Sequence, residues 1–84
     1  MDTSSGPGDT VAISSFEKNK KEEVRVSIDT FHGRKLINIR VFFKDDDGTM
    51  KPGKQGIAVS VDRYKDLAGA ILELGQYLKS NGMI

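Results

Sequence analysis

The chain has 84 residues, with 13 lysines and arginines against 12 aspartates and glutamates, and it contains no cysteine and no tryptophan. This length allows one small domain, and the lack of cysteine excludes disulfides, thiolate zinc sites and cysteine nucleophiles. A domain of this size buries only about 60–65% of the surface that its unfolded chain exposes, so it often needs additional stabilisation. Dimerisation is the means of stabilisation that this composition leaves.

Charge is unevenly distributed along the chain, although the net charge is only +1. Residues 22–44 and 50–56 are both net basic, and an acidic cluster, Asp45-Asp46-Asp47, separates them. If that cluster lies at a loop tip, the flanking surfaces can still present a positive stripe to a partner. Because no apolar run is longer than Val41-Phe42-Phe43 and the N-terminus lacks a hydrophobic signal region, we expect a soluble, intracellular protein without a membrane partner.

The N-terminal part of the chain predicts a tail and then a first strand. Residues 1–10 are small and polar, with too little apolar surface to offset the cost of ordering, so we predict a flexible tail ahead of a domain at residues 11–80. Residues 11–16 are typical of a short strand, and the polar residues 17–21 are typical of a hairpin connection.

Alternation of apolar and polar residues is clearest in the middle of the chain. It predicts one strand over residues 24–31 and a second over residues 35–44, joined by a short turn at His32-Gly33. Each strand then has one buried face and one exposed face. The predicted buried positions are Val24, Val26, Ile28, Ile37, Ile39 and Val41, and the opposite positions are Arg25, Ser27, Asp29, Asn38, Arg40 and Phe42.

The C-terminal half predicts a loop, a short strand and a helix. Residues 45–56 are rich in Asp, Gly and Pro, which favour turns, so we predict a loop there rather than a strand. Residues 57–59 then form a short final strand, and Ser60 is a good helix N-cap. Apolar residues recur at three- and four-residue steps from Tyr64 to Leu78, which predicts an amphipathic helix over about residues 62–79.

This order of elements predicts an α+β fold: a four-stranded antiparallel sheet followed by one C-terminal helix. One helix covers only part of one sheet face. Its own apolar stripe is broad, because Leu72 and Leu74 lie off the main row. We therefore expect the helix to pack on its own sheet and on a second copy, in a symmetric homodimer.

Enzymatic and metal chemistry find little support in the residues. Asp45-Asp46-Asp47-Gly48 does not fit a calcium-binding loop, because the required first and twelfth ligand positions are not met, and a solvated turn is the simpler interpretation. His32 has no second histidine or serine–acid partner and is better explained as a turn residue. The glycines of residues 52–56 precede a strand rather than open a helix, so they form no phosphate cradle. We expect no catalytic residue, metal or cofactor.

Aromatic residues beside basic ones give the clearest functional signal. Phe31 precedes His32 and Arg34, and the pair Phe42-Phe43 lies between Arg40 and Lys44. Aromatic rings stack on unpaired bases while lysine and arginine neutralise phosphates, so this combination suits single-stranded nucleic acid better than duplex. The alternative is that one ring of each neighbouring pair belongs to the core.

Several segments together resemble a known family. These are residues 24–28, residues 31–34, residues 37–43 and above all residues 48–57, GTMKPGKQGI. They are similar to the single-stranded-DNA-binding domain of the transcriptional coactivator family called positive cofactor four, and the similarity covers about residues 11–79. The resemblance implies a curved four-stranded antiparallel sheet with one helix, assembled as a symmetric dimer with channels for single-stranded DNA. The compact, single-domain form resembles a bacterial member.

The resemblance also implies functional residues. Phe31 and Phe43 match base-stacking aromatics, Phe43 standing where eukaryotic members have tryptophan, and Arg40 matches an arginine that faces the channel. Glu22 and Glu23 stand where those members have a lysine and an apolar residue, which lowers the positive charge. The nucleic-acid-binding residues expected on these grounds are Arg25, Phe31, His32, Arg34, Arg40, Phe43, Lys51, Lys54 and Gln55.

The expected function is that of a dimeric single-stranded DNA-binding protein with little sequence preference, acting in transcription regulation or DNA maintenance. RNA is a second candidate ligand and the transcription machinery a candidate partner. The expected location is the cytoplasm, associated with the nucleoid, in a bacterium, or the nucleus in a eukaryote. The alternative is an interaction adaptor of the transcription machinery that binds nucleic acid weakly or not at all. Exposure of Phe31, Phe43 and Arg40 on one concave face would favour DNA binding, whereas burial of all three would favour the adaptor.

Overall fold

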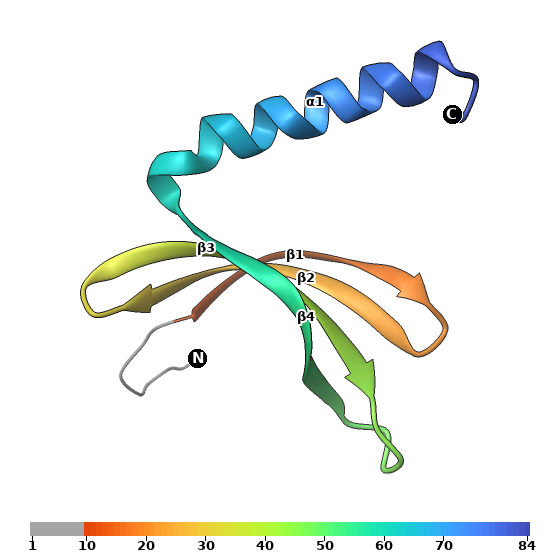
Figure 1. The fold of residues 1–84 in the computed structure, drawn as a ribbon. Coiled ribbons are helices and arrows are strands. Elements are labelled where there is room, and N and C mark those ends of the chain that lie inside the picture. The colour runs from red at the N-terminus through yellow and green to blue at the C-terminus, as the bar shows by residue number, and fades with distance from the viewer. Residues whose placement is uncertain (1–9) are drawn as a thin grey trace.

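The structure is a computed structural model that describes residues 10–84, so the tail predicted at residues 1–10 lies outside the described residues except for Thr10, which belongs to the first strand and not to a tail. Four strands are followed by a short 3₁₀ helix and one α-helix (Figure 1). The elements are β1 (Thr10–Asn19), β2 (Glu22–Phe31), β3 (Arg34–Lys44), β4 (Met50–Ser60), η1 (Val61–Arg63) and α1 (Tyr64–Ser80). The predicted α+β order, with an antiparallel sheet preceding one C-terminal helix, is confirmed.

The sheet is an antiparallel meander with the strand order β1-β2-β3-β4, and its long strands are curved and twisted (Figure 1). The β2–β3 ladder is regular from Glu22 opposite Phe43 to Phe31 opposite Arg34. The turn that joins these strands contains His32 and Gly33, with φ angles of 52° and 76°. Positive φ at both central residues is the geometry that matches the twist of a tight hairpin. The predicted hairpin is therefore present, with strands slightly longer than the alternation indicated.

The register of the central strands separates the two faces of the sheet as the alternation predicted. Val24 faces Val41, Val26 faces Ile39 and Ile28 faces Ile37, which places these side chains on one apolar face. Ile57 and Val59 of β4 continue this row, because they pair with Ile39 and Ile37. The opposite face carries polar residues, with Arg25 opposite Arg40 and Ser27 opposite Asn38.

The loop predicted over residues 45–56 is wrong in its second half. Only residues 45–49 form a turn, and β4 begins at Met50 and runs through Pro52, Gly53 and Gly56. Pro52 is tolerated because β4 lies at the edge of the sheet. A Cβ atom at Gly56 would lie 2.7 Å from the carbonyl oxygen of Ile39, so glycine is there for a close approach of two backbones. The ladder is irregular between Arg40 and Phe42, where β4 has extra residues.

The helical segment begins where the sequence predicted. The Ser60 hydroxyl accepts a hydrogen bond of 3.3 Å from the backbone N–H of Asp62, which caps the 3₁₀ turn η1. The α-helix proper starts at Tyr64 and ends at Ser80. After it, Asn81 and Gly82 donate backbone hydrogen bonds to the last turn, and Gly82 has a φ of 69°, as is usual at a helix C-terminus.

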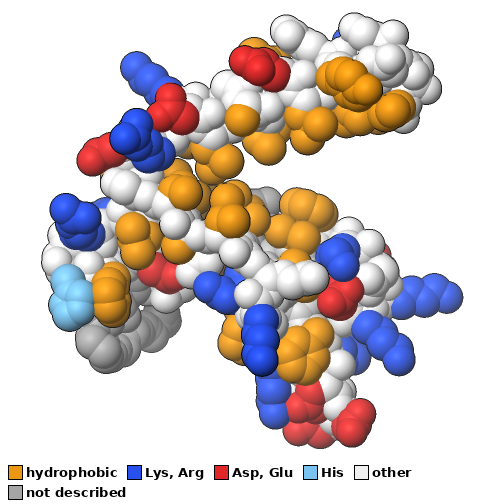
Figure 2. Space-filling view, viewed as in Figure 1, with side chains coloured by type: hydrophobic (Ala, Val, Ile, Leu, Met, Phe, Trp, Pro, Cys, Tyr) orange, Lys and Arg blue, Asp and Glu red, His pale blue; other side chains and the backbone are white. Residues whose placement is uncertain are grey.

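The single chain has almost no core. Among the described residues only the hydrophobic side chain of Ile37 is buried, at 8% exposure, and α1 has no buried residue at all. Figure 2 shows hydrophobic side chains along the side of α1 that faces the sheet, with open space between them and the sheet. Leu72 and Leu74 are 64% and 51% exposed. The predicted packing of the helix on its own sheet is therefore wrong for most of its length, since α1 runs over the sheet without closing onto it (Figures 1 and 2).

Candidate nucleic-acid interface

Two arginines lie side by side on the polar face of the sheet. Arg25 and Arg40 are direct partners in the β2–β3 ladder. Arg25 is held by an ion pair with Glu23 and lies over the ring of Phe42, with its guanidinium carbon 4.2 Å from the ring centroid. Arg40 Nη1 donates a hydrogen bond of 3.1 Å to the carbonyl oxygen of Gly53. These contacts fix both guanidinium groups in place and leave them only partly exposed.

A polar network continues from these arginines along the same face. Asp29 accepts hydrogen bonds from Thr10 Oγ1 at 2.7 Å and from Asn38 Nδ2 at 2.6 Å. Within the described residues, the Oδ1 atom of Asn38 is buried and has no hydrogen-bond partner. A pocket of about 190 Å³ lies on this surface. It is lined by Thr10, Arg25, Ser27, Asp29, Asn38, Arg40, Phe42 and Pro52.

The β2–β3 turn carries a second group of predicted site residues, which we call the turn patch: Phe31, His32 and Arg34. Phe31 is 58% exposed, and its ring meets that of His32 edge-on, with centroids 4.1 Å apart and an interplanar angle of 67°. Arg34 is exposed and pairs directly with Phe31 in the ladder. Phe31 and Arg34 belong to the same face as Arg25 and Arg40, because side chains alternate along each strand. The turn patch therefore extends the arginine-bearing face.

The third group lies at the other end of the ladder, and we call it the loop patch: Glu22, Phe43, Lys51, Lys54 and Gln55. Glu22 and Lys51 are the ladder partners of Phe43 on its two sides. Phe43 is 39% exposed. Together with Val41 and Gly53, the residues Glu22, Phe43, Lys54 and Gln55 line a cavity of about 220 Å³.

The register corrects one expectation about the site. Phe43 lies three residues beyond Arg40 in a regular strand, so it belongs to the opposite face, together with Val41. Phe31, Arg40 and Phe43 therefore do not share one face, although Phe31 and Phe43 are both exposed, so neither of the two arrangements that would separate DNA binding from the adaptor is present in full. The two groups nevertheless meet at Gly53. The carbonyl oxygen of this residue is bonded to Arg40, and a Cβ atom at the same residue would lie 3.7 Å from the Phe43 ring.

Two residues of this surface were not among the predicted site residues. Phe42 shares a face with Arg25 and Arg40, and the alternation of the sequence already placed it opposite the apolar row. Glu22 borders the cavity beside Phe43, but only the strand pairing shows this neighbour. Its position in the sequence carries no signal for that contact.

The two lysines of the loop patch differ in whether they already form an ion pair within the protein. Lys51 forms an ion pair with Asp45 of the acidic turn. Lys54 forms no ion pair within residues 10–84 and is exposed. The turn carboxylates also accept backbone hydrogen bonds, from Asp47 N to Asp45 at 2.8 Å and from Thr49 N to Asp47 at 2.9 Å. The bonds from Thr49 hold the pKa of Asp47 below its usual value.

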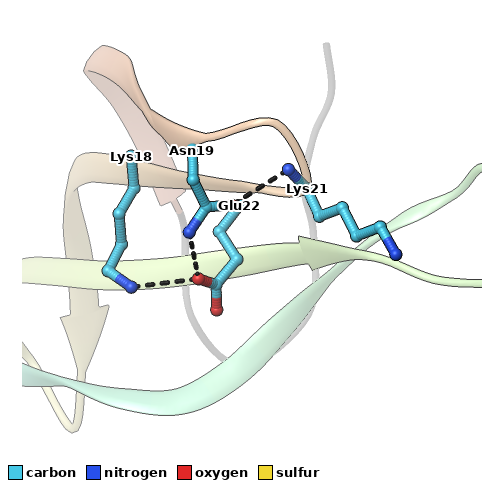
Figure 3. A network of polar contacts seen from close by, with 4 residues as sticks. All are labelled: Lys18, Asn19, Lys21 and Glu22. Carbon is cyan, nitrogen blue, oxygen red and sulfur yellow. Dashed lines mark hydrogen bonds and ion pairs between the residues drawn. The ribbon is translucent and has the colours of Figure 1, made fainter.

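A small network fixes the carboxylate of Glu22 (Figure 3). Its Oε1 atom accepts hydrogen bonds from Asn19 Nδ2 at 2.7 Å and from Lys18 Nζ at 2.9 Å. Asn19 is itself held by the β1–β2 turn, because its Oδ1 atom accepts a hydrogen bond of 3.0 Å from the backbone N–H of Lys21. The bonds from Asn19 and Lys18 lower the pKa of Glu22, so the group is ionised at neutral pH.

Residues 18–70 match the family described as Transcriptional Coactivator p15 (PC4), and the chain belongs to this family. It is 37% identical to the RNA polymerase II transcriptional coactivator SUB1 of Saccharomyces cerevisiae over 79 residues, which are 93% of this chain and 26% of SUB1. It is 36% identical to the coactivator KIWI of Arabidopsis thaliana over 75% of this chain and 54% of KIWI. The chain thus spans only about a quarter to a half of the length of these two relatives.

Solved structures show the same fold. A PC4 homologue from Burkholderia pseudomallei superposes with a TM-score of 0.73 at 23% identity, covering 79% of this chain and 97% of that one. The MoSub1 protein in a DNA complex superposes with a TM-score of 0.57 at 36% identity, covering 82% of this chain and 84% of that one. Among residues 10–84, no helix has the length and apolar character needed to cross a membrane.

Proposed function

We propose that the protein binds single-stranded DNA, with little sequence preference, along the arginine-bearing face and onto the loop patch. The observation that carries this proposal is the meeting of the two surfaces at Gly53, whose carbonyl oxygen accepts a hydrogen bond from Arg40 and which lines one cavity with Phe43. A strand that follows the arginines can therefore continue to an aromatic ring. The MoSub1 relative, solved as a DNA complex, supports the proposal.

The chemistry of the surface favours a single strand over a duplex. Phe31 and Phe43 expose ring surface at the two ends of the β2–β3 ladder, and unpaired bases can stack on such rings whereas paired bases cannot. Arg25, Arg34, Arg40 and Lys54 supply charge for phosphates between and beside the rings. Stacking and phosphate contacts are available to every base, which is the reason to expect little sequence preference, and RNA offers the same groups.

We also propose that the chain works as a homodimer. No side chain of α1 is buried in the single chain, most of its large apolar side chains are exposed, and the described residues provide one buried side chain only. A domain with so little burial cannot offset the entropy lost on folding. A second copy that packs its helix against the exposed apolar side of α1 supplies the missing core. Because the same surface is used by both copies, the interface is two-fold symmetric.

The biological role proposed here is transcription regulation or DNA maintenance, with contact to the transcription machinery as a second activity. Relatives named as RNA polymerase II transcriptional coactivators support this role. In a bacterial cell the protein would work in the nucleoid, and in a eukaryotic cell it would work in the nucleus.

Titration of labelled single- and double-stranded oligonucleotides at two salt concentrations tests the proposal. We expect tighter binding to the single strand and a modest salt dependence, because few unpaired cations contact phosphate. Equal or tighter binding to duplex would contradict the single-strand surface. Absence of binding to either oligonucleotide would favour the interaction adaptor instead. Sedimentation at micromolar concentration tests the dimer, and a monomer there would contradict it.

A further inference from the structure

A carboxylate borders the ring on which a base would stack. Glu22 is the direct ladder partner of Phe43, and directly opposed side chains on one sheet face lie within contact distance. Both residues line the cavity that also contains Gln55 and Lys54. An acidic group at this position opposes phosphate binding, so its presence beside the ring calls for another explanation.

The carboxylate is oriented as well as close. Oε1 is held by Asn19 and Lys18, as described above, whereas Oε2 accepts no hydrogen bond from any of the described residues. Figure 3 shows this second oxygen pointing away from both donors. Glu22, the ladder partner of Phe43, therefore holds one oxygen on Asn19 and Lys18 and keeps a second acceptor without a partner among the described residues.

Nucleobases differ in what they offer such an acceptor. Cytosine, adenine and guanine each carry an exocyclic amino group that donates hydrogen bonds, and carboxylates are known partners of the cytosine N4 amino group. Thymine and uracil carry carbonyl oxygens in place of the amino group, which a carboxylate repels, and their single donor on that edge, N3–H, lies between two carbonyl oxygens. Gln55, across the same cavity, can donate or accept and so discriminates less.

We infer that Glu22 makes the Phe43 site selective for a base with an exocyclic amino group, such as cytosine, over thymine or uracil. This inference rests on the proposed single-strand binding and refines it at one position of the surface. At the other positions of the bound strand the protein contacts only the faces of the bases and the phosphates, so the identity of those bases does not affect affinity. The selectivity of the whole protein is therefore modest.

The test compares short oligodeoxycytidylate with oligodeoxyuridylate of the same length, at one salt concentration and neutral pH. These two ligands differ chiefly at the edge that would face Glu22. We expect the protein to bind the cytidine oligonucleotide about three- to tenfold more tightly. In Glu22→Gln the ratio should fall to one or below, because the amide oxygen stays on Asn19 and Lys18 and the amide then presents an N–H donor, which suits the O4 atom of uracil and not the N4 amino group of cytosine.

Glu73→Gln is the control, because it removes the same charge from α1, away from the cavity that Glu22 and Phe43 line. It should preserve the ratio. A ratio near one in the unaltered protein would overturn the inference while single-strand binding stands. The same conclusion follows if Glu22→Gln strengthens binding of both ligands equally, since Glu22 would then only repel phosphate. Failure to bind either ligand would overturn the proposed function itself, and the inference with it.

Discussion

The guanidinium of Arg25 lies over the ring of Phe42, 4.2 Å from its centroid, although Arg25 pairs in the ladder with Arg40 and Phe42 pairs with Glu23. The contact is therefore a diagonal one across β2 and β3. Glu23 completes it by forming an ion pair with Arg25. The ring and the carboxylate together orient an arginine that would otherwise be repelled by its neighbour Arg40.

Arg25→Lys should weaken binding of single-stranded DNA about two- to fivefold, because lysine keeps the charge but loses the planar contact with the Phe42 ring. The dependence on salt should not change, since the number of cations is the same. Fluorescence titration at two salt concentrations measures both quantities. Arg63→Lys, in η1 and away from the sheet face, is the control and should bind normally. Unchanged affinity in Arg25→Lys would show that only the charge of Arg25 matters.

Phe43→Ala should reduce the free energy of binding by roughly 1–3 kcal/mol and leave the salt slope nearly unchanged, because stacking releases no counterions. The measurement is the same titration, with thermal unfolding as a check on folding. Phe43 is 39% exposed, so its loss should destabilise the protein less than the roughly 3–5 kcal/mol typical of a buried phenylalanine. Unfolding or dissociation of the dimer in this variant would instead make the ring part of the core.

Lys54→Ala should lose affinity mainly at low salt and flatten the plot of log affinity against log salt by about 0.7, the value for one phosphate contact of a single strand. Lys51→Ala is the informative comparison, because Lys51 already forms an ion pair with Asp45 and therefore attracts a phosphate less strongly. Its slope should change by less than that of Lys54→Ala. Equal changes in the two variants would mean that the ion pair with Asp45 opens when DNA binds.

Ile71→Glu should shift the protein from dimer to monomer and lower its stability. In the single chain Ile71 is 59% exposed, and a substitution at such a surface position normally changes stability by no more than about 0.5 kcal/mol. A larger loss, together with a concentration-dependent melting temperature, is expected only if a second copy covers the residue. Glu73→Lys is the control on the opposite side of α1. Sedimentation and thermal unfolding over a range of protein concentrations separate the two outcomes.

Local patterns predicted the central hairpin and the helix because both depend on regular periodicity. Val24, Val26 and Ile28 could be assigned to one face from their spacing alone, and Ser60 was recognisable as a cap. The helix packing could not be predicted in the same way. An apolar stripe shows that a face is covered but not by what, and in the single chain α1 leaves that face open.

The candidate site, like the fold, could be predicted only in part. Residue types at the site could be proposed from the resemblance, and alternation along one strand indicates which of its own side chains share a face. Because Arg40 and Phe43 are three residues apart in one strand, the sequence alone places them on opposite faces. That Glu22 lies beside Phe43 becomes known only from the pairing of β2 with β3. The strand at residues 50–56 was missed because glycine and proline favour turns locally, while here an edge position and close backbone contact determine the conformation.

Gly56→Ala should destabilise the protein by about 1–3 kcal/mol, the usual cost of forcing an extra carbon into a packed site. The added Cβ atom would lie 2.7 Å from the carbonyl oxygen of Ile39 and 3.0 Å from the Cα atom of Arg40, and neither backbone atom can move aside without disturbing the β3–β4 ladder. Gly69→Ala is the opposite case: a Cβ atom at this position in α1 would meet nothing within 4 Å, so the change should stabilise the helix by roughly 0.5–1 kcal/mol. Urea unfolding of both variants at one protein concentration measures the difference, and a neutral Gly56→Ala would mean that β4 can move away from β3 at little cost.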